Sequence, residues 1–234
     1  MKKSIFAAIL LALCLCSAAL CHAGEKSKLV RNLESGKSQV VVAYGTSLTE
    51  TGPWVKQVDD ILQKRYPGLL KVINNGGSGQ WSDWGVKNLD EKVLNKKPDT
   101  VFIEFSINDS VDRFEASVET SRSNLNNMID RILKQNADCE IILMVMNCVN
   151  PAAERWAKGR SRLKEFNQAY SDVAKERGFL LIDHYPNWQR ILDRDPALFA
   201  KYVPDGLHPA AEGCAKVVTP VIIRALGIED EKIK

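Results

Sequence analysis

Five nearly continuous apolar runs recur along the chain, and amphipathic segments separate them. Continuous rather than alternating apolar runs are typical of parallel strands that are covered on both faces. The predicted strands span residues 38–44, 69–74, 100–105, 140–146 and 178–183. Strands that alternate with helices indicate a parallel sheet with helices on both sides. The pattern therefore predicts an α/β fold, and no repeat, low-complexity tract or linker interrupts it.

Amphipathic helices are predicted where apolar residues recur at intervals of three and four. Three such helices are marked by Val55, Val58, Ile61 and Leu62, by Leu125, Met128, Ile129, Ile132 and Leu133, and by Val217, Val218, Val221, Ile222 and Leu226. The last of them is expected to begin near Pro209. The chain has 234 residues, which suits one sizeable domain and is short for two.

The first residues have the pattern of a secretory signal. Lys2 and Lys3 are followed by an uncharged apolar stretch over 5–20, and residues 21–23 offer small side chains for cleavage. We expect a signal peptide over 1–23, one domain over 24–234, and a secreted or periplasmic protein without stable membrane insertion. A retained anchor is the alternative. Cys21 suggests a lipoprotein signal, but Leu20 directly before it fits that processing poorly.

Charge gives little reason to expect a polyanionic partner. The chain has 32 Lys and Arg against 29 Asp and Glu. Without Lys2 and Lys3 the basic count falls to 30, so the expected mature chain carries a net charge of +1. The basic residues are also scattered, which argues against nucleic-acid binding.

Removal of the signal leaves Cys139, Cys148 and Cys214. An odd number cannot pair completely and argues against a disulfide scaffold. Cys139 and Cys148 are expected at opposite ends of one strand, about 30 Å apart at roughly 3.3 Å per residue, and so cannot bond to each other. All three are interpreted as small buried apolar side chains.

Polar residues follow every predicted strand, at the edge where an open parallel sheet binds its ligands. These segments are 45–47, 74–79, 106–109, 147–150 and 183–185, and residues 205–209 precede the last helix. Together they contain the groups of a serine hydrolase. Ser47 offers a hydroxyl, and His208 lies three residues after Asp205, a separation that lets the carboxylate reach the Nδ1–H of the ring. Donors to an oxyanion would be the Ser47 N–H, a glycine N–H of 76–79 and the Asn108 amide.

These residues resemble the SGNH, or GDSL-like, esterases and lipases over most of the chain, from about Val40 to Pro209. "YGTSLTE" is similar to the first block of that family, "VINNGGSGQW" to the second, "FIEFSIND" to the third and "DGLHP" to the last. No single block is specific to the family, whereas the four blocks in this order are. The resemblance assigns the oxyanion glycine to Gly79. This sequence departs from the pattern of the family at Thr46, where Asp is common, and at Ser106, which replaces a glycine.

The resemblance implies a flavodoxin-like α/β/α sandwich with a five-stranded parallel sheet. It implies a catalytic set of Ser47, Asp205 and His208, with an oxyanion hole of Ser47, Gly79 and Asn108, and no cofactor or metal. The α/β-hydrolase motif is a poor match, because Thr49 fills its last glycine position and the serine follows the first strand.

Each of these residues also has a structural interpretation. Ser47 could cap the next helix, although Pro53 makes a helix start near Thr51 more natural. The glycines of 76–79 could form a tight turn or a phosphate cradle. Asn108 could close a local turn. His208 could cap or pack under the last helix, or ligate a metal together with Asp205.

His184, beside Asp183, is the rival candidate for the base, and we expect it on the surface or lining the cleft. Trp54, Trp81 and Trp84 are either core residues or a platform that stacks on sugar or acyl groups. The sequence thus favours a secreted serine esterase that removes short acyl groups, such as acetyl, from carbohydrate. The substrate would be a small-molecule or polysaccharide ester. An acyl-lipid hydrolase of the lysophospholipase or thioesterase type and a noncatalytic carbohydrate-binding relative are the alternatives.

Overall fold

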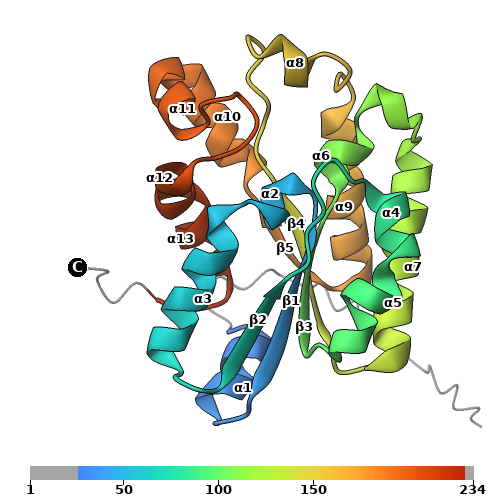
Figure 1. Ribbon diagram of the computed structural model, residues 1–234, viewed down its shortest axis with the longest axis vertical. Helices are drawn as coiled ribbons and strands as arrows, with labels where there is room; N and C mark the ends of the chain where they lie inside the picture. Colours follow the sequence, from blue (N-terminus) through green and yellow to red (C-terminus); the bar gives the residue numbers. More distant parts are fainter. Residues whose placement is uncertain (1–25, 230–234) are drawn as a thin grey trace, which may run out of the picture.

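The centre of the protein is a parallel sheet of five strands in the order β2-β1-β3-β4-β5 (Figure 1). The computed structural model describes residues 26–229, so the expected signal peptide lies outside the described residues. The strands are β1 (Gln39–Gly45), β2 (Leu70–Asn74), β3 (Thr100–Glu104), β4 (Glu140–Val145) and β5 (Leu180–Asp183). Every neighbouring pair is parallel. This order is that of flavodoxin-like folds, and the predicted fold class is confirmed.

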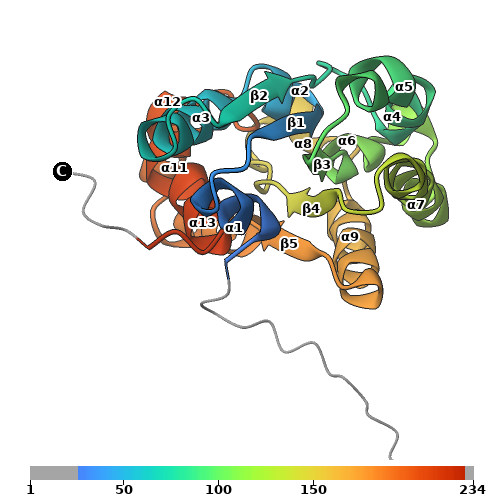
Figure 2. The same cartoon turned by 90° about the horizontal axis from the view of Figure 1, so that it is seen from below.

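Helices cover both faces of the sheet, which makes three layers (Figure 2). One face carries α1 (Lys28–Glu34), α3 (Pro53–Arg65), α10 (Tyr185–Arg194), α11 (Pro196–Tyr202), α12 (Ala211–Gly213) and α13 (Thr219–Ala225). The other carries α4 (Ser82–Lys87), α5 (Leu89–Lys92), the 3-10 turn η1 (Leu94–Lys96), α7 (Val118–Gln135) and α9 (Leu163–Arg177). Two of the helices predicted from apolar spacing, α3 and α7, are present at the expected positions.

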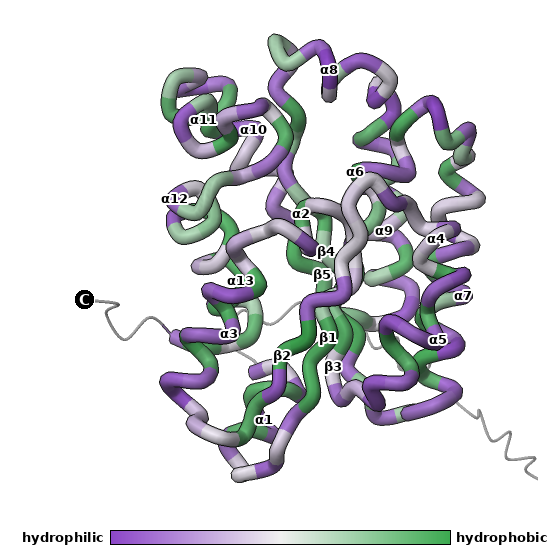
Figure 3. The backbone as a smooth tube through the Cα atoms, viewed as in Figure 1, coloured by the Kyte–Doolittle hydropathy of each residue, from purple (hydrophilic) through white to green (hydrophobic). Residues whose placement is uncertain are grey.

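Successive strand residues point into two separate cores. In β1, Val41 and Ala43 belong to the core under α3 and α13, whereas Val42 and Tyr44 belong to the core under α7 and α9. Because side chains alternate across a strand, a sheet buried on both faces must be apolar at every position. Figure 3 shows the consequence: the central strands are mostly coloured hydrophobic, whereas hydrophilic and hydrophobic residues alternate along the helices and along the edge strand β2.

The last predicted helix begins at Ala211, close to Pro209, and contains a π-helical segment over Cys214–Val218 before α13. Pro220 has no N–H to donate to a carbonyl of the preceding turn, which explains why the regular α-helical pattern is interrupted there.

Three short helices lie beyond the carboxyl ends of the strands, at the upper edge of the sheet in Figure 1. They are α2 (Ser47–Glu50) after β1, α6 (Ser106–Asp109) after β3, and α8 (Glu154–Ala157) in the loop after β4. The 3-10 turn η2 (Asp112–Phe114) follows α6. This edge therefore carries the segments in which the sequence places its candidate chemistry.

Candidate active site

The turn between β1 and α2 exposes Ser47 at the edge of the sheet. Thr46 is the residue that caps α2, because its hydroxyl oxygen accepts a hydrogen bond from the Leu48 N–H at 3.2 Å. Ser47 is the first helical residue and is half-buried. The structure therefore excludes the interpretation of Ser47 as the helix cap and leaves its hydroxyl available to other partners.

Ser47, His208 and Asp205 form one line of hydrogen bonds. The Ser47 Oγ lies 2.9 Å from Nε2 of His208, and Nδ1 of the same ring lies 2.6 Å from Oδ2 of Asp205. The other carboxylate oxygen of Asp205 accepts from the backbone N–H groups of Leu207, at 2.9 Å, and His208, at 2.7 Å. These bonds fix the carboxylate, so the His208 ring is held with Nδ1 toward Asp205 and Nε2 toward Ser47.

The carboxylate of Asp205 stays ionised in this arrangement. Partial burial pushes its pKa upward, but the hydrogen bonds from His208 and Leu207 outweigh that effect and leave the pKa below the ordinary value. An ionised carboxylate only accepts hydrogen bonds, so Nδ1 of His208 carries the proton and Nε2 is free to accept one from Ser47.

Gly79 lies in a loop that is tied to two of the short helices. Its φ of +72° is in the left-handed region, which favours glycine. On one side of it the Ser78 N–H donates to the Glu50 carboxylate at 2.7 Å, and on the other the Ser82 N–H donates to Asp109 at 2.8 Å. The loop is thereby attached to α2, which carries Ser47, and to α6.

Asn108 is buried beside this loop, with 5% of its surface exposed. Its amide Nδ2 donates to the Gln80 carbonyl at 2.7 Å, which uses one of two hydrogens. The side chain makes this contact across the site instead of closing a local turn. Among residues 26–229, the backbone N–H groups of Ser47 and Gly79 have no acceptor. The N–H groups of Ser47 and Gly79 and one amide hydrogen of Asn108 thus remain available as donors.

Glu104, at the end of β3, lies beneath the turn that carries Ser47 and was not singled out by the sequence analysis. Its Oε1 accepts from the Thr46 N–H and the Thr49 hydroxyl, both at 2.7 Å. A side chain on Gly45 would collide with this carboxylate, since a Cβ there would lie 2.3 Å from Oε1. Burial raises the pKa of Glu104 to about 7. The available signal was a single acidic residue ending an apolar strand.

We expect the buried Glu104 to make stability depend on pH. Because its pKa is raised from 4.5 to about 7, its contribution is fully present below pH 4.5 and is lost as the pH rises through about 7. The free energy of unfolding, relative to Glu104→Gln, should fall by about 3 kcal/mol over that range. Urea denaturation from pH 4.5 to 8 measures this difference. Glu119→Gln, at an exposed position of α7, is the control, and a constant difference for Glu104 would contradict the prediction.

Trp156 and Arg160, from the loop after β4, also border the site. The Trp156 ring stands edge-on to the His208 ring, with centroids 5.3 Å apart. Arg160 donates to the carbonyls of Ile107 and Trp156 and, at 3.3 Å, to Oδ1 of Asn108. No periodic pattern marks this irregular loop, so the sequence contained no signal that joins it to Asn108.

His184 is not where the sequence analysis expected it. The side chain is fully buried rather than on the surface or lining the cleft. Neither ring nitrogen has a partner among the described residues, and burial lowers the pKa of His184 to about 3. It is therefore a neutral core residue, and the ring that contacts Ser47 is that of His208.

The three tryptophans have different surroundings. Trp54 is 2% exposed and its ring N–H donates to the Leu48 carbonyl at 2.8 Å, so the interpretation as a stacking platform is wrong for it. Trp84 packs on Tyr44 and Phe105 in the core under α7. Trp81 is half-buried and stacks on Phe114, with centroids 5.2 Å apart.

Cys139, Cys148 and Cys214 are free and buried, as the sequence analysis interpreted them. Burial raises the pKa of each thiol to about 12, which keeps it protonated and unreactive. Within residues 26–229, no three His, Cys, Asp or Glu side chains are grouped so that they could hold a metal ion. The same residues include no helix that is both long and apolar enough to cross a bilayer.

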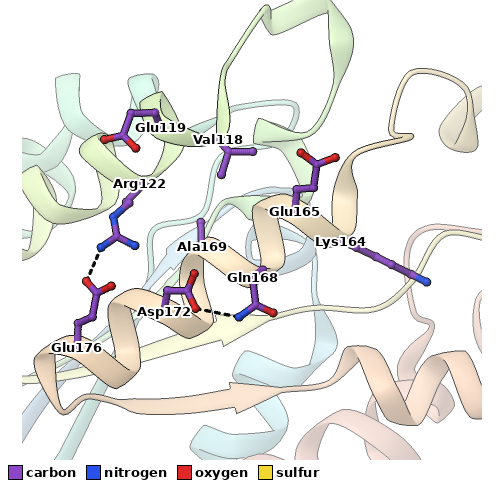
Figure 4. Close-up of a pocket in the computed structure, with 9 residues that line it drawn as sticks. All are labelled: Val118, Glu119, Arg122, Lys164, Glu165, Gln168, Ala169, Asp172 and Glu176. Atoms are coloured by element: carbon purple, nitrogen blue, oxygen red, sulfur yellow. Dashed lines mark hydrogen bonds and ion pairs between the residues drawn. The ribbon is translucent and has the colours of Figure 1, made fainter.

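A cavity of about 30 Å³ lies next to the Ser47 and His208 side chains. Its other lining residues are Leu48, Thr51, Gly52, Trp54, Met146, Pro209 and Cys214. A larger hollow lies between α7 and α9, where Arg122 pairs with Glu176 (Figure 4). The nine residues lining that hollow include no serine, cysteine or histidine.

Comparison of the sequence with models of protein families identifies the family of this chain. The model of the GDSL-like Lipase/Acylhydrolase family matches residues 41–216, from β1 through the segment that holds Asp205 and His208. The chain belongs to this family. The resemblance inferred from the four sequence blocks is thus confirmed, and the protein is an enzyme of the esterase and acylhydrolase class.

Individual relatives of this family member are distant in sequence. A curated relative, an uncharacterized lipoprotein of Bacillus subtilis (strain 168), is 24% identical over 180 residues, which are 66% of this chain and 73% of that protein. An acetylxylan esterase of Geobacillus stearothermophilus has a TM-score of 0.71 and 20% identity, over 85% of this chain and 98% of that one. A lipase/acylhydrolase of Enterococcus faecalis has a TM-score of 0.67 and 24% identity, over 81% and 95%. At these identities the structures support the fold.

Proposed function

We propose that the protein is an exported serine esterase that removes short acyl groups, acetyl above all, from carbohydrate. The observation that carries the proposal is the line of hydrogen bonds from Ser47 through His208 to Asp205, in a chain of the GDSL-like family. A hydroxyl, a base and an orienting carboxylate in this geometry are what nucleophilic ester hydrolysis requires.

In the proposed reaction, Nε2 of His208 takes the proton from the Ser47 hydroxyl while Oγ attacks the ester carbonyl carbon. The negative charge that develops on the carbonyl oxygen is stabilised by the N–H groups of Ser47 and Gly79 and by the free amide hydrogen of Asn108. His208 then gives its proton to the departing alcohol, which leaves an acyl group on Ser47. Water, deprotonated by His208, repeats the attack, releases the acid and restores the serine. No step needs a cofactor.

The size of the cavity beside Ser47 supports a short acyl group. About 30 Å³ holds one or two groups of the size of a water molecule. The methyl group of an acetyl ester fits such a space, and a long alkyl chain does not. The acetylxylan esterase among the structural neighbours is in keeping with a carbohydrate ester as substrate.

Export is proposed from the signal-like residues 1–23. The curated relative of Bacillus subtilis is named a lipoprotein, which supports a location outside the cytoplasmic membrane or anchored to it.

We expect hydrolysis of p-nitrophenyl esters by the mature chain to be fastest for acetate and to fall at least tenfold in kcat/KM by octanoate, because each methylene that the cavity excludes loses its favourable burial. Met146 lines the cavity and Met144 does not. Met146→Ala should therefore move the preference toward butyrate, whereas Met144→Ala, an equal truncation in the same strand region, should leave the order of the esters unchanged. A preference for long chains would favour an acyl-lipid hydrolase instead. Inertness toward the whole series would favour a carbohydrate-binding relative.

A further inference from the structure

Two arginine side chains flank the proposed oxyanion hole. Nη2 of Arg113, in η2, is the nearest atom to the position that a Cβ on Gly79 would take, at 4.0 Å. Nη2 of Arg160 lies 3.3 Å from Oδ1 of Asn108. Gly79 and Asn108, two of the three residues proposed to hold the oxyanion, thus each have a guanidinium beside them.

The loops that carry these arginines are joined to each other. The Asp112 N–H donates to the Gly159 carbonyl at 2.8 Å, so Arg113 and Arg160 directly follow the two bonded residues. They are close enough for the charge of Arg113, together with the larger effect of burial, to lower the pKa of Arg160 to about 10. The two positive charges therefore repel each other at a fixed place.

No carboxylate neutralises this pair. Within residues 26–229, neither Arg113 nor Arg160 takes part in an ion pair, and the acceptors of Arg160 are two carbonyls and an amide. The nearest acidic neighbour in sequence, Asp112, has its carboxylate against Gly159 and acts on Arg162. Three of the five N–H donors of Arg160 are used, which leaves two. The Arg113 guanidinium lies over the Phe114 ring and donates no hydrogen bond to any of the residues that the structure describes.

The loop after β4, which carries Arg160, adds an aromatic ring and further positive charge beside the site. Trp156 stands against His208, and the Arg155 guanidinium lies 4.4 Å from the centre of the Trp156 ring. Residues 153–162 include four basic side chains and a single acidic one, Glu154, although the mature chain as a whole is nearly neutral. Positive charge is thus concentrated at the mouth of the site, where it attracts anions.

We propose, building on the esterase function above, that the natural ester carries an anionic oxyacid group, a carboxylate or a phosphate, close to its scissile bond, and that Arg113 and Arg160 bind that group. An acylated acidic sugar has this chemistry, because it joins an acyl ester and an anionic group on one small ring. Planar guanidiniums bind carboxylate and phosphate oxygens through paired N–H groups.

The test compares acetate release from three matched sugars, each a methyl pyranoside with one acetyl ester: a neutral glucoside, a glucuronate and a 6-phosphate. The readout is the ratio of kcat/KM on each anionic sugar to that on the neutral one. We expect a ratio of about ten or more at low salt, decreasing as salt screens the charges. Arg113→Gln should lower that ratio about tenfold, and the larger of the two anionic ratios identifies carboxylate or phosphate as the group bound.

Arg113→Gln is the decisive variant, because in the described part of the chain Arg113, unlike Arg160, makes no hydrogen bond to Asn108 that would orient the amide. Arg122→Gln, the same change in the distant hollow of Figure 4, should leave the ratio unchanged. A ratio near one in the unmodified enzyme, or one that Arg113→Gln does not alter, overturns the anion site while acetate release still supports the esterase.

A binding measurement, which does not require ester hydrolysis, tests the anion site independently of the proposed esterase activity. Titration of tryptophan fluorescence with methyl glucuronate, glucose 6-phosphate and methyl glucoside reports binding alone. If no ester is hydrolysed but an anionic sugar binds at least tenfold more tightly than the neutral one, and Arg113→Gln removes the difference, the anion site stands and the esterase does not. Equal binding of all three sugars overturns the anion site.

Discussion

Replacement of Ser47 by alanine is expected to reduce kcat on p-nitrophenyl acetate by a factor on the order of 10⁶, as loss of the nucleophile does in other serine hydrolases. The physical reason is that His208 keeps its contact with Asp205 but has no hydroxyl to deprotonate. A serine-directed fluorophosphonate should also add its mass to Ser47 in the unmodified enzyme, with loss of fluoride, and fail to label the variant. Activity and peptide mass spectrometry measure the two effects.

The control for this experiment is Ser123→Ala, which removes an exposed hydroxyl of α7 on the outer surface of the domain. It should retain full activity and labelling at Ser47. The double variant of Ser47 and His208 should be no less active than Ser47→Ala alone, because groups that act as a unit lose their effect together. If Ser47→Ala retained more than a few per cent of the activity, the proposed mechanism would be wrong.

Asp205→Asn is expected to lower kcat by about 10⁴ with little change in KM. The amide occupies nearly the same volume, and one oxygen can still accept the backbone N–H bonds of Leu207 and His208. What changes is the contact with Nδ1 of His208: an amide NH₂ facing the ring would favour the tautomer with the proton on Nε2, and that nitrogen then cannot accept from Ser47. Steady-state kinetics at pH 7 to 8 measures the loss.

Asp183→Asn is the matched control, since Asp183 adjoins the rival histidine, His184. Its carboxylate accepts from the Tyr185 N–H at 2.9 Å, a bond that an amide oxygen can keep. This variant should stay within about twofold of the unmodified kcat, because His184 is buried and does not contact Ser47. The reverse result, with activity lost at Asp183 and kept at Asp205, would transfer the role of the base to the other histidine.

Some of the site was predictable because its residues are close in sequence or follow a strand. Asp205 and His208 are separated by three residues, so their contact is a local matter that the "DGLHP" segment already contains. Ser47 and Asn108 each come three residues after a predicted strand, and parallel strands bring their carboxyl ends to one edge. Their proximity therefore followed from the fold class.

Other parts of the site depend on contacts between segments that share no pattern. Trp156 lies in the short helix α8 and Arg160 in the loop that follows it, and only the folded chain brings them against His208 and Asn108. The surroundings of the tryptophans could not be predicted from the sequence either. Trp54 and Trp81 are similar in sequence context, but one is buried under α2 and the other is stacked on Phe114 near the rim.

The sequence by itself determined the parallel α/β fold, the five strands within two residues of their bounds, and the edge where the candidate chemistry lies, because alternation and burial on both faces leave a periodic record in the apolar positions. Only the tertiary structure decided that His184 is buried and neutral, that Glu104 holds the turn before Ser47, and that two arginines, without an ion pair in the described chain, adjoin Gly79 and Asn108. Burial and charge at such positions come from residues distant in the chain, and no local pattern of residues encodes which of them will meet.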